Sequence, residues 1–235
     1  MRNVNLGKVV KVPAVIKAAE ILRNAIVDGT IAPGSRITEG ELSEQMQLSR
    51  ATIRSALHQL ASEGLTTLKR YAGWSVASLS PNDIWELYTI RSTMERLGAR
   101  LVAQKINPQA ALVINRTLSN LEKQCSAGSW TRIADADFKF HKDIVSLAGN
   151  GRLIAQYALI ESQVRMYIRS LDSLFFDAST IIEQHVRIAK AIIAGDSAGA
   201  GDLAEAHNLV DGEMLARHLA ARELKVPPMR VKTEK

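Results

Sequence analysis

The chain has 235 residues, with 30 Lys and Arg against 24 Asp and Glu and a formal net charge of +6. This length is enough for two modest domains with packed cores. A single cysteine, Cys125, excludes a disulfide within the chain and favours a reducing compartment, so we expect a cytoplasmic protein. No apolar run approaches the roughly 20 residues of a membrane-spanning helix, and the first residues lack the apolar core of a signal peptide, which argues against a membrane protein.

The positive charge lies mainly in the first third of the chain. Residues 1–80 hold ten Lys and Arg against six Asp and Glu, a net charge of +4, whereas residues 81–235 hold 20 against 18, a net charge of +2. A basic segment is consistent with a polyanionic partner, although many basic proteins bind no nucleic acid. The N-terminal third is therefore where such a partner is expected to bind.

Two helices are expected before residue 47. After Pro13, apolar residues recur at three- and four-residue steps as far as Gly29, whose freedom to adopt positive φ is typical of a helix end. A turn at Pro33-Gly34 then leads to a short helix. Thr38 and Glu41 match a capping box at its start, in which each side chain bonds an unpaired amide of the first turn.

The third helix, expected from Ser49 to Gly64, has two distinct faces. Arg50 and Arg54 lie four residues apart near its start, on a face that leaves both side chains free to reach a partner. An apolar face, expected to pack within the domain, consists of Ile53, Ala56, Leu57 and Leu60. This division is typical of a recognition helix, whose first residues contact DNA while the remaining turns pack against other helices.

Two short strands are expected after the third helix, over residues 65–70 and 74–77, around a turn at Tyr71-Ala72-Gly73. Lys69, Arg70 and Tyr71 lie near the tip of this hairpin and are suited to contacts with a phosphate backbone. Three helices followed by a hairpin predict a winged helix-turn-helix domain.

Beyond Ser80 and Pro81, which match an N-cap followed by a first-turn proline, the pattern is helical. Helices joined by short connections predict an antiparallel bundle, so the fold class is mainly α. The expected helices span about 81–106, 108–126, 131–148, 152–174, 179–194 and 197–225.

Four polar residues in the predicted bundle form a pattern that packing does not explain. Asp137 and His141 lie four apart on one helical face, whereas His185 and His207 each lie in the middle of another helix. Imidazole and carboxylate groups from facing helices suit zinc, nickel, iron or manganese. Any one of these histidines alone is better explained as a solvent-facing or core residue, but together the four favour a metal site.

Arg91 interrupts an otherwise apolar helix of the predicted bundle. An arginine at such a position more often forms a surface salt bridge than it holds a ligand. It remains a candidate contact for a bound carboxylate, because it is a strong donor to that group.

The N-terminal segment resembles that of GntR-family transcription regulators, through Pro33 to Glu39, Leu42 to Met46, Ser49 to Leu57, Leu60 to Leu65 and Gly73. The second segment resembles the all-helical FCD effector domain of the FadR subfamily, through Arg91 to Glu95, Asp137 to His141, Asn150, Glu183 to His185, Asp196 and His207. Together the two resemblances cover about residues 14–222.

The resemblance implies a homodimer that binds an inverted repeat of double-stranded DNA, with an effector pocket beside a metal held by one Asp and three His. Those metal ligands would be Asp137, His141, His185 and His207, and the residues expected to contact DNA are Arg36, Ser49, Arg50, Thr52, Arg54, Arg70 and Gly73. The chain departs from the family pattern at Gly40, where some relatives carry a basic residue, and at Ala51-Thr52, which replaces the commoner Thr-Pro.

We therefore expect a transcription regulator, not an enzyme, whose DNA binding is controlled by a small organic acid bound beside a divalent metal ion, zinc or nickel. A metal-dependent enzyme and a regulator that senses the metal itself are the alternatives. The expected organisation is a flexible tail over 1–11, the winged helix-turn-helix over 12–79, the effector-binding and dimerisation domain over 80–226 and a disordered basic tail over 227–235.

Overall fold

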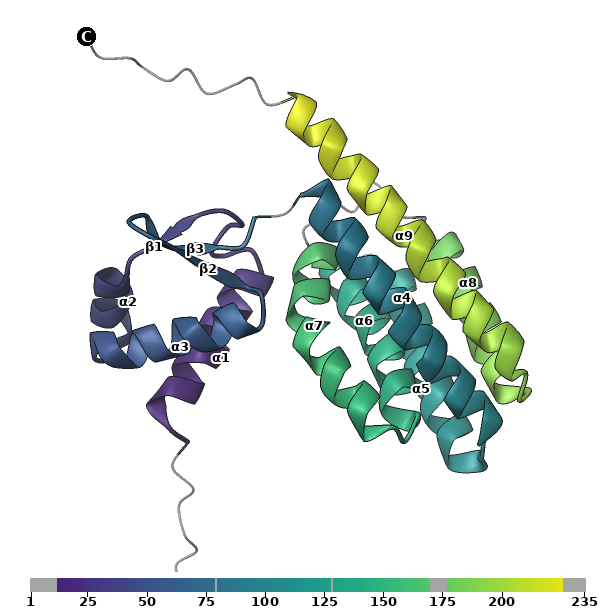
Figure 1. Cartoon of the computed structure of the whole chain (residues 1–235). Helices are drawn as coiled ribbons and strands as arrows, with labels where there is room; N and C mark the ends of the chain where they lie inside the picture. The colour runs from purple at the N-terminus through teal and green to yellow at the C-terminus, as the bar shows by residue number, and fades with distance from the viewer. Residues whose placement is uncertain (1–11, 79, 128, 170–176, 226–235) are drawn as a thin grey trace, which may run out of the picture. The chain divides into compact units, whose positions relative to one another are not determined.

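The computed structural model describes residues 12–78, 80–127, 129–169 and 177–225 (Figure 1). The tails expected over 1–11 and 227–235 lie outside the described residues, as does the end of the helix expected over 152–174. The chain divides into two compact units between Ala77 and Ser78.

The first unit consists of three helices and a small sheet (Figure 1): α1 (Ala14–Val27), β1 (Arg36–Ile37), α2 (Glu39–Met46), α3 (Arg50–Ser62), β2 (Thr66–Lys69) and β3 (Gly73–Val76). Helix α3 packs its predicted apolar face against α1, and all four residues of that face are inaccessible to solvent: Ile53, Ala56, Leu57 and Leu60. Arg23 of α1 forms two 2.6 Å hydrogen bonds with Glu63 at the end of α3. The predicted helical periodicity is confirmed here.

The sheet contains one strand more than the sequence predicts. Its order is β1-β3-β2, with β2 and β3 forming the expected hairpin and β1 pairing Arg36 with Ser75 and Ile37 with Trp74. Two residues are too few for an alternating pattern, so β1 could not be recognised from the sequence. At the hairpin tip, Tyr71 has a positive φ of 64° and is 94% exposed.

The predicted N-caps of α2 and α3 have different outcomes. The Ser49 hydroxyl oxygen accepts a hydrogen bond from the Thr52 amide at 3.1 Å, which confirms the cap of α3. Thr38 is the N-cap residue of α2, but its side chain makes no capping hydrogen bond, so the predicted capping box is wrong. Thr38 and Glu41 are both exposed, so the amides of this first turn can be hydrated without the box.

The described residues of the second unit form an all-helical bundle: α4 (Pro81–Gln104), α5 (Pro108–Ala127), α6 (Trp130–Leu147), α7 (Gly151–Arg169), α8 (Ala178–Ile193) and α9 (Ser197–Lys225). The expected fold class, a winged helix-turn-helix followed by a helical bundle, is confirmed. Ser80 caps α4 through the Asp83 amide, and Pro81 opens its first turn as predicted.

Helices α4 and α9 lie side by side and run in opposite directions (Figure 1). Their axes approach closely because glycines of α9 face large residues of α4. A Cβ added at Gly212 would lie 2.6 Å from the Tyr88 Cβ, and one at Gly201 would lie 2.5 Å from the Arg100 side chain. Among the described residues, no helix is both long and apolar enough to cross a membrane.

Candidate functional site

The four polar residues that the sequence singles out converge in the core of the bundle. Asp137 and His141 come from α6, His185 from α8 and His207 from α9, and one ligand atom of each lies within 4.8 Å of the others. The Nε2 atom of His141 lies 3.0 Å from that of His185 and 3.1 Å from that of His207. Asp137 Oδ1 lies 2.9 Å from the His185 Nε2 atom. We call these four residues the Asp/His3 cluster.

Each histidine of the Asp/His3 cluster is oriented by an acceptor on the other side of its ring. These Nδ1 partners are the Glu95 carboxylate for His141 (2.6 Å), the Ile181 carbonyl for His185 (2.7 Å) and the Gln184 side-chain oxygen for His207 (3.0 Å). An acceptor at Nδ1 requires the ring to donate there, so the neutral ring presents a lone pair at Nε2. The three lone pairs therefore point toward one another and toward a carboxylate.

Such a convergence of acceptors requires positive charge at its centre. A single proton satisfies one pair, such as His185 and Asp137, but leaves the Nε2 atoms of His141 and His207 in contact without one. A divalent ion would satisfy all four groups together, because imidazole nitrogens and carboxylate oxygens are ligands that such ions bind. The Asp/His3 cluster therefore fits a metal ion on chemical grounds.

The contacts within the Asp/His3 cluster shift the pKa values of two of its members. Burial opposes the charge on Asp137, but the hydrogen bond and charge of His185 hold its pKa far below the usual value. Burial, together with the charges of His185 and His141, holds the pKa of His207 well below its usual value. An ionised carboxylate and a neutral imidazole are the forms that bind a metal.

Glu95 of α4 joins the Asp/His3 cluster to three other helical positions. Its Oε1 accepts hydrogen bonds from Arg91 Nε and the Tyr157 hydroxyl, both at 2.7 Å, and its Oε2 accepts from His141 Nδ1 at 2.6 Å and Asn208 Nδ2 at 2.7 Å. Burial opposes ionisation, but the charges of Arg91 and His141 and the bonds that they donate hold the pKa of Glu95 well below its usual range. A buried carboxylate with four donors is a rigid support for His141.

Arg91 is not on the surface, contrary to the more common outcome considered from the sequence. Its side chain is 1% exposed and forms an ion pair with Glu95, one turn later in α4. Both side chains are buried, so this is not a surface salt bridge. Its Nη2 atom is buried and has no hydrogen-bond partner among the described residues. The guanidinium carbon lies 5.1 Å from the centre of the Tyr88 ring. A buried donor without an acceptor is costly unless a ligand or water supplies one.

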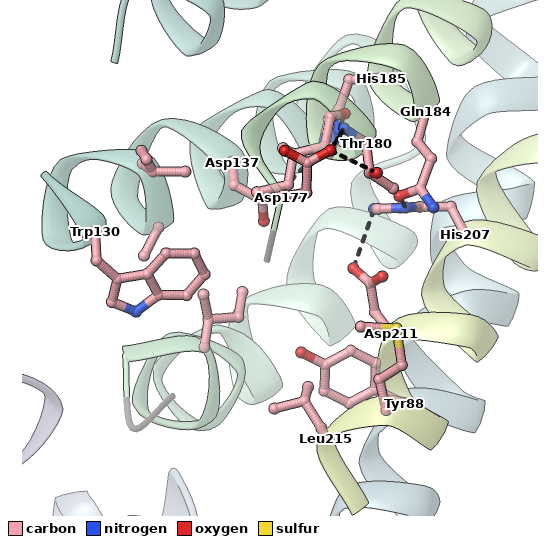
Figure 2. A pocket seen from close by; sticks show the side chains of 15 residues that line it. Tyr88, Trp130, Asp137, Asp177, Thr180, Gln184, His185, His207, Asp211 and Leu215 are labelled. Carbon is pink, nitrogen blue, oxygen red and sulfur yellow. Dashed lines mark hydrogen bonds and ion pairs between the residues drawn. The ribbon is translucent and has the colours of Figure 1, made fainter. Parts of the chain in front are cut away.

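A cavity of about 200 Å³ lies beside the Asp/His3 cluster and is lined by three of its members, Asp137, His185 and His207, but not by Arg91 (Figure 2). Its other walls are largely apolar and include Tyr88, Trp130, Ile133, Ala134, Ile168, Ile181, Met214 and Leu215. A small organic molecule in this cavity would therefore lie against the Asp/His3 cluster.

Asp211 of α9 is a further carboxylate on the cavity wall, one turn after His207. Its Oδ2 atom lies 3.5 Å from His207 Nε2, and Figure 2 shows this contact next to Tyr88. Burial, and next the charge of Asp137, raise the pKa of Asp211 to about 7. The four-residue spacing from His207 was present in the sequence, but nothing in the pattern separated Asp211 from an ordinary surface aspartate.

The candidate DNA-binding residues lie in the first unit, most of them exposed. Arg50, in the first turn of α3, is exposed, and a Cβ added at Gly40 of α2 would lie 3.5 Å from its Nη2 atom. Arg54 is also exposed, but its Nε and Nη2 atoms donate to the two carboxylate oxygens of Glu39 at 2.9 and 2.8 Å. Glu39 also accepts a 3.0 Å hydrogen bond from Trp74 Nε1 in β3, a pairing that the sequence did not indicate.

The remaining candidates lie near the start of α3 and on the wing. The hydroxyls of Ser49 and Thr52 are 2.8 Å apart and hydrogen-bonded to each other. Arg36 is exposed on β1, and the exposed Arg70 lies over the Tyr71 ring at 5.2 Å. Gly73 has a φ of 81°, a conformation that favours glycine and allows the tight hairpin after the tip.

Fold and site together define a class of protein: a winged helix-turn-helix unit joined to a helical unit with a cavity beside a cluster that could hold a metal ion. Residues 16–76 match the family described as bacterial regulatory proteins, gntR family, and residues 86–209 match the FCD domain. The chain belongs to the GntR family of bacterial transcription regulators, in the group that carries an FCD domain.

Characterised and uncharacterised regulators are among the relatives. The chain is 30% identical over 173 residues to the uncharacterized HTH-type transcriptional regulator YdhC of Bacillus subtilis, covering 73% of this chain and 77% of that protein. It is 30% identical over 162 residues to the Nta operon transcriptional regulator of Aminobacter aminovorans, covering 68% and 74%. The chain is thus a DNA-binding transcription regulator, which is not an enzymatic role.

Two solved structures share the fold. A GntR transcriptional regulator from Rhodococcus sp. RHA1 matches with a TM-score of 0.74 at 24% identity, covering 86% of this chain and 96% of that one. McbR/YncC of E. coli matches with a TM-score of 0.69 at 18% identity, covering 92% and 99%. At these identities the similarity concerns the fold alone.

Proposed function

We propose that this regulator is a cytoplasmic homodimer whose binding to an inverted-repeat operator is controlled by a small carboxylic acid bound beside a divalent metal ion. The ion, zinc or nickel, would be held by the Asp/His3 cluster. The observation that carries the proposal is the convergence of three anchored imidazoles and one carboxylate on the wall of an apolar cavity. When bound, the ion supplies a Lewis-acidic position for a ligand oxygen.

The contacts of Arg91 support a carboxylate as the effector. Its buried Nη2 atom has no acceptor among the described residues, and it lies close to Tyr88, which lines the cavity. A guanidinium is the strongest carboxylate donor among the side chains. A carboxylate that reaches both the ion and Arg91 would satisfy this donor and lie against the apolar wall.

For DNA recognition we propose that Arg50 and Arg54 of α3 lie in the major groove, while Arg36, Arg70 and Gly73 contact the backbone beside it. Ser49 and Thr52, at the start of α3, would approach the DNA backbone at the edge of the same groove. Effector binding can alter operator affinity only if the effector binds the two dimer geometries unequally. We infer that Glu95, which links His141 and Arg91 to α7 and α9, transmits part of this difference.

The test begins with duplexes selected from a randomised pool by the full-length protein. Fluorescence anisotropy then measures the affinity for the selected duplex with added metal, with chelator, and with a panel of small organic acids. We expect an acid to change the affinity only in the metal-loaded protein. Affinity that follows metal concentration with no acid effect would favour a metal sensor, and affinity indifferent to chelator and acids would refute the proposal.

A further inference from the structure

The charged side chains around the cavity indicate which charges an effector should have. Asp211 is a largely buried carboxylate on the cavity wall, with 17% of its side chain exposed. Its contact with His207 Nε2, at 3.5 Å, is longer than an ordinary hydrogen bond, and that nitrogen presents a lone pair when its ring donates to Gln184. Among the described residues no hydrogen-bond donor to Asp211 is found. Its carboxylate therefore lacks a partner of positive charge on the protein side.

The other charges near the cavity are already balanced against one another. Glu95 and Asp137 are carboxylates, Arg91 is a cation paired with Glu95, and Asp211 is the third carboxylate. With a divalent ion in the Asp/His3 cluster and Asp211 in its ionised form, three negative charges face three positive ones. An effector that carried only a carboxylate would add an uncompensated negative charge to an apolar cavity, which is unfavourable.

A ligand with both charges avoids this cost. We propose that the effector is a small α-amino acid or a close relative, with a protonated amine on the carbon next to its carboxylate. The carboxylate faces the metal ligands, and the ammonium group donates to Asp211. Asp211 and His207 lie 3.5 Å apart. This short distance suits a ligand whose ammonium and carboxylate groups are attached to the same carbon. The inference rests on the proposed function, because it presupposes a carboxylic acid beside the Asp/His3 cluster.

The walls of the cavity fit the remainder of such a molecule. Ile133, Met214 and Leu215 leave an apolar surface for a side chain, and no lysine or arginine lines the cavity among the described residues. Asp177, another carboxylate on the cavity wall, is exposed and already accepts the Ser179 and Thr180 amides as the N-cap of α8. Asp211 is therefore the carboxylate available to an ammonium group.

The experiment uses the full-length, metal-loaded protein and measures binding by calorimetry and thermal shift. The probes are matched sets: each of the twenty amino acids, the acid lacking its amine and the corresponding 2-hydroxy acid. We expect at least one amino acid to bind about tenfold or more tightly than its amine-free analogue, because a charge-assisted hydrogen bond is lost. In Asp211→Asn this preference should fall to about twofold or less, with the metal content unchanged.

Asp202→Asn is the matched control, since it makes the same chemical change in α9 at an exposed residue paired with Arg96. It should keep the preference for the amino acid. Equal or tighter binding of the amine-free or hydroxy acid, a preference that survives Asp211→Asn, or loss of metal in Asp211→Asn would each overturn the inference while leaving a metal-dependent acid effector intact. Absence of binding by every acid, with no effect of chelator on operator affinity, would instead refute the proposed function.

Discussion

Glu39 and Arg54 are joined by two parallel hydrogen bonds, in which Nε and Nη2 of the arginine donate to the two oxygens of the carboxylate. This pairing occupies one edge of the guanidinium and fixes its plane. The opposite edge, formed by Nη1 and the second hydrogen of Nη2, remains available and has the geometry that reads O6 and N7 of guanine. Glu39 thereby positions a recognition-helix side chain from α2, and its bond from Trp74 extends the connection to the wing.

Replacing Glu39 with glutamine should weaken selective DNA binding. The amide can accept one of the two bonds but not both, so the Arg54 head becomes mobile and pays more conformational entropy on binding. We expect affinity for the selected duplex to fall roughly tenfold or less, with relaxed selectivity at the same base that Arg54→Ala affects. Glu41→Gln is the control, because Glu41 is exposed in the same turn. Unchanged selectivity in Glu39→Gln would exclude this positioning role.

The same ion pair should affect the acid dependence of stability. The hydrogen bond from Arg54, with smaller contributions from Trp74 and the nearby charges, outweighs burial and lowers the pKa of Glu39. The stability contribution is therefore fully present above the ordinary pKa of a glutamate and is lost as the pH falls through the lowered value of the folded state. At acid pH, the Tm of Glu39→Gln should accordingly depend less on pH than the Tm of the wild type. Near neutrality the two proteins should show the same dependence of Tm on pH.

Arg50→Ala should reduce specific DNA affinity by about 1–3 kcal/mol if the side chain is bidentate to a base. Arg50 is exposed at the start of α3 and lies next to Gly40, where the absence of a side chain leaves space beside its guanidinium. Competition against unrelated duplex separates specific from non-specific binding. Arg217→Ala, at an exposed arginine of α9, serves as control. Unaltered operator selectivity in Arg50→Ala would remove Arg50 from base recognition.

Features within one helix could be predicted from the sequence, whereas contacts between helices could not. Helix periodicity found the apolar face of α3 and the helices of the bundle, because spacing within one helix reports which face is buried. It placed Asp137 and His141 on one face, yet only the fold brings His185 and His207 to the same point. Glu95 was part of a recognised segment, but its four donors come from other turns and helices, so its role depends on tertiary contacts.

His185→Ala should abolish tight metal binding, because His185 contacts both Asp137 and His141 within the Asp/His3 cluster. Elemental analysis after dialysis should give about one metal ion per wild-type chain and much less for the variant. The alanine also leaves a cavity in the core, so the informative quantity is the difference in Tm with and without chelator in each protein. This difference should vanish in His185→Ala and persist in His58→Ala, whose histidine is exposed on α3. A persistent chelator effect in His185→Ala would refute the assignment.

Gly212→Ala should destabilise the bundle by about 1–3 kcal/mol, since its Cβ would lie 2.6 Å from the Tyr88 Cβ and would force α4 and α9 apart. Gly151→Ala is the matched control at the start of α7, where an added Cβ meets nothing within 4 Å. There, the higher helix propensity of alanine should leave stability equal or raise it by up to about 1 kcal/mol. Equal unfolding midpoints in urea for the two variants would contradict the close α4–α9 packing.

Ser49→Ala and Thr38→Ala compare two N-caps that look alike in the sequence but differ in the fold. Ser49 accepts the Thr52 amide, whereas Thr38 makes no side-chain capping bond. Loss of the first should therefore cost about 1 kcal/mol of stability, and loss of the second should cost less, because no capping bond is removed. Urea unfolding followed by Trp74 fluorescence, with Trp85 and Trp130 replaced by phenylalanine, reports on the first unit alone. An equal cost for the two substitutions would show that the Ser49 capping bond adds no stability to α3. The stability of α3 would then come from its apolar face.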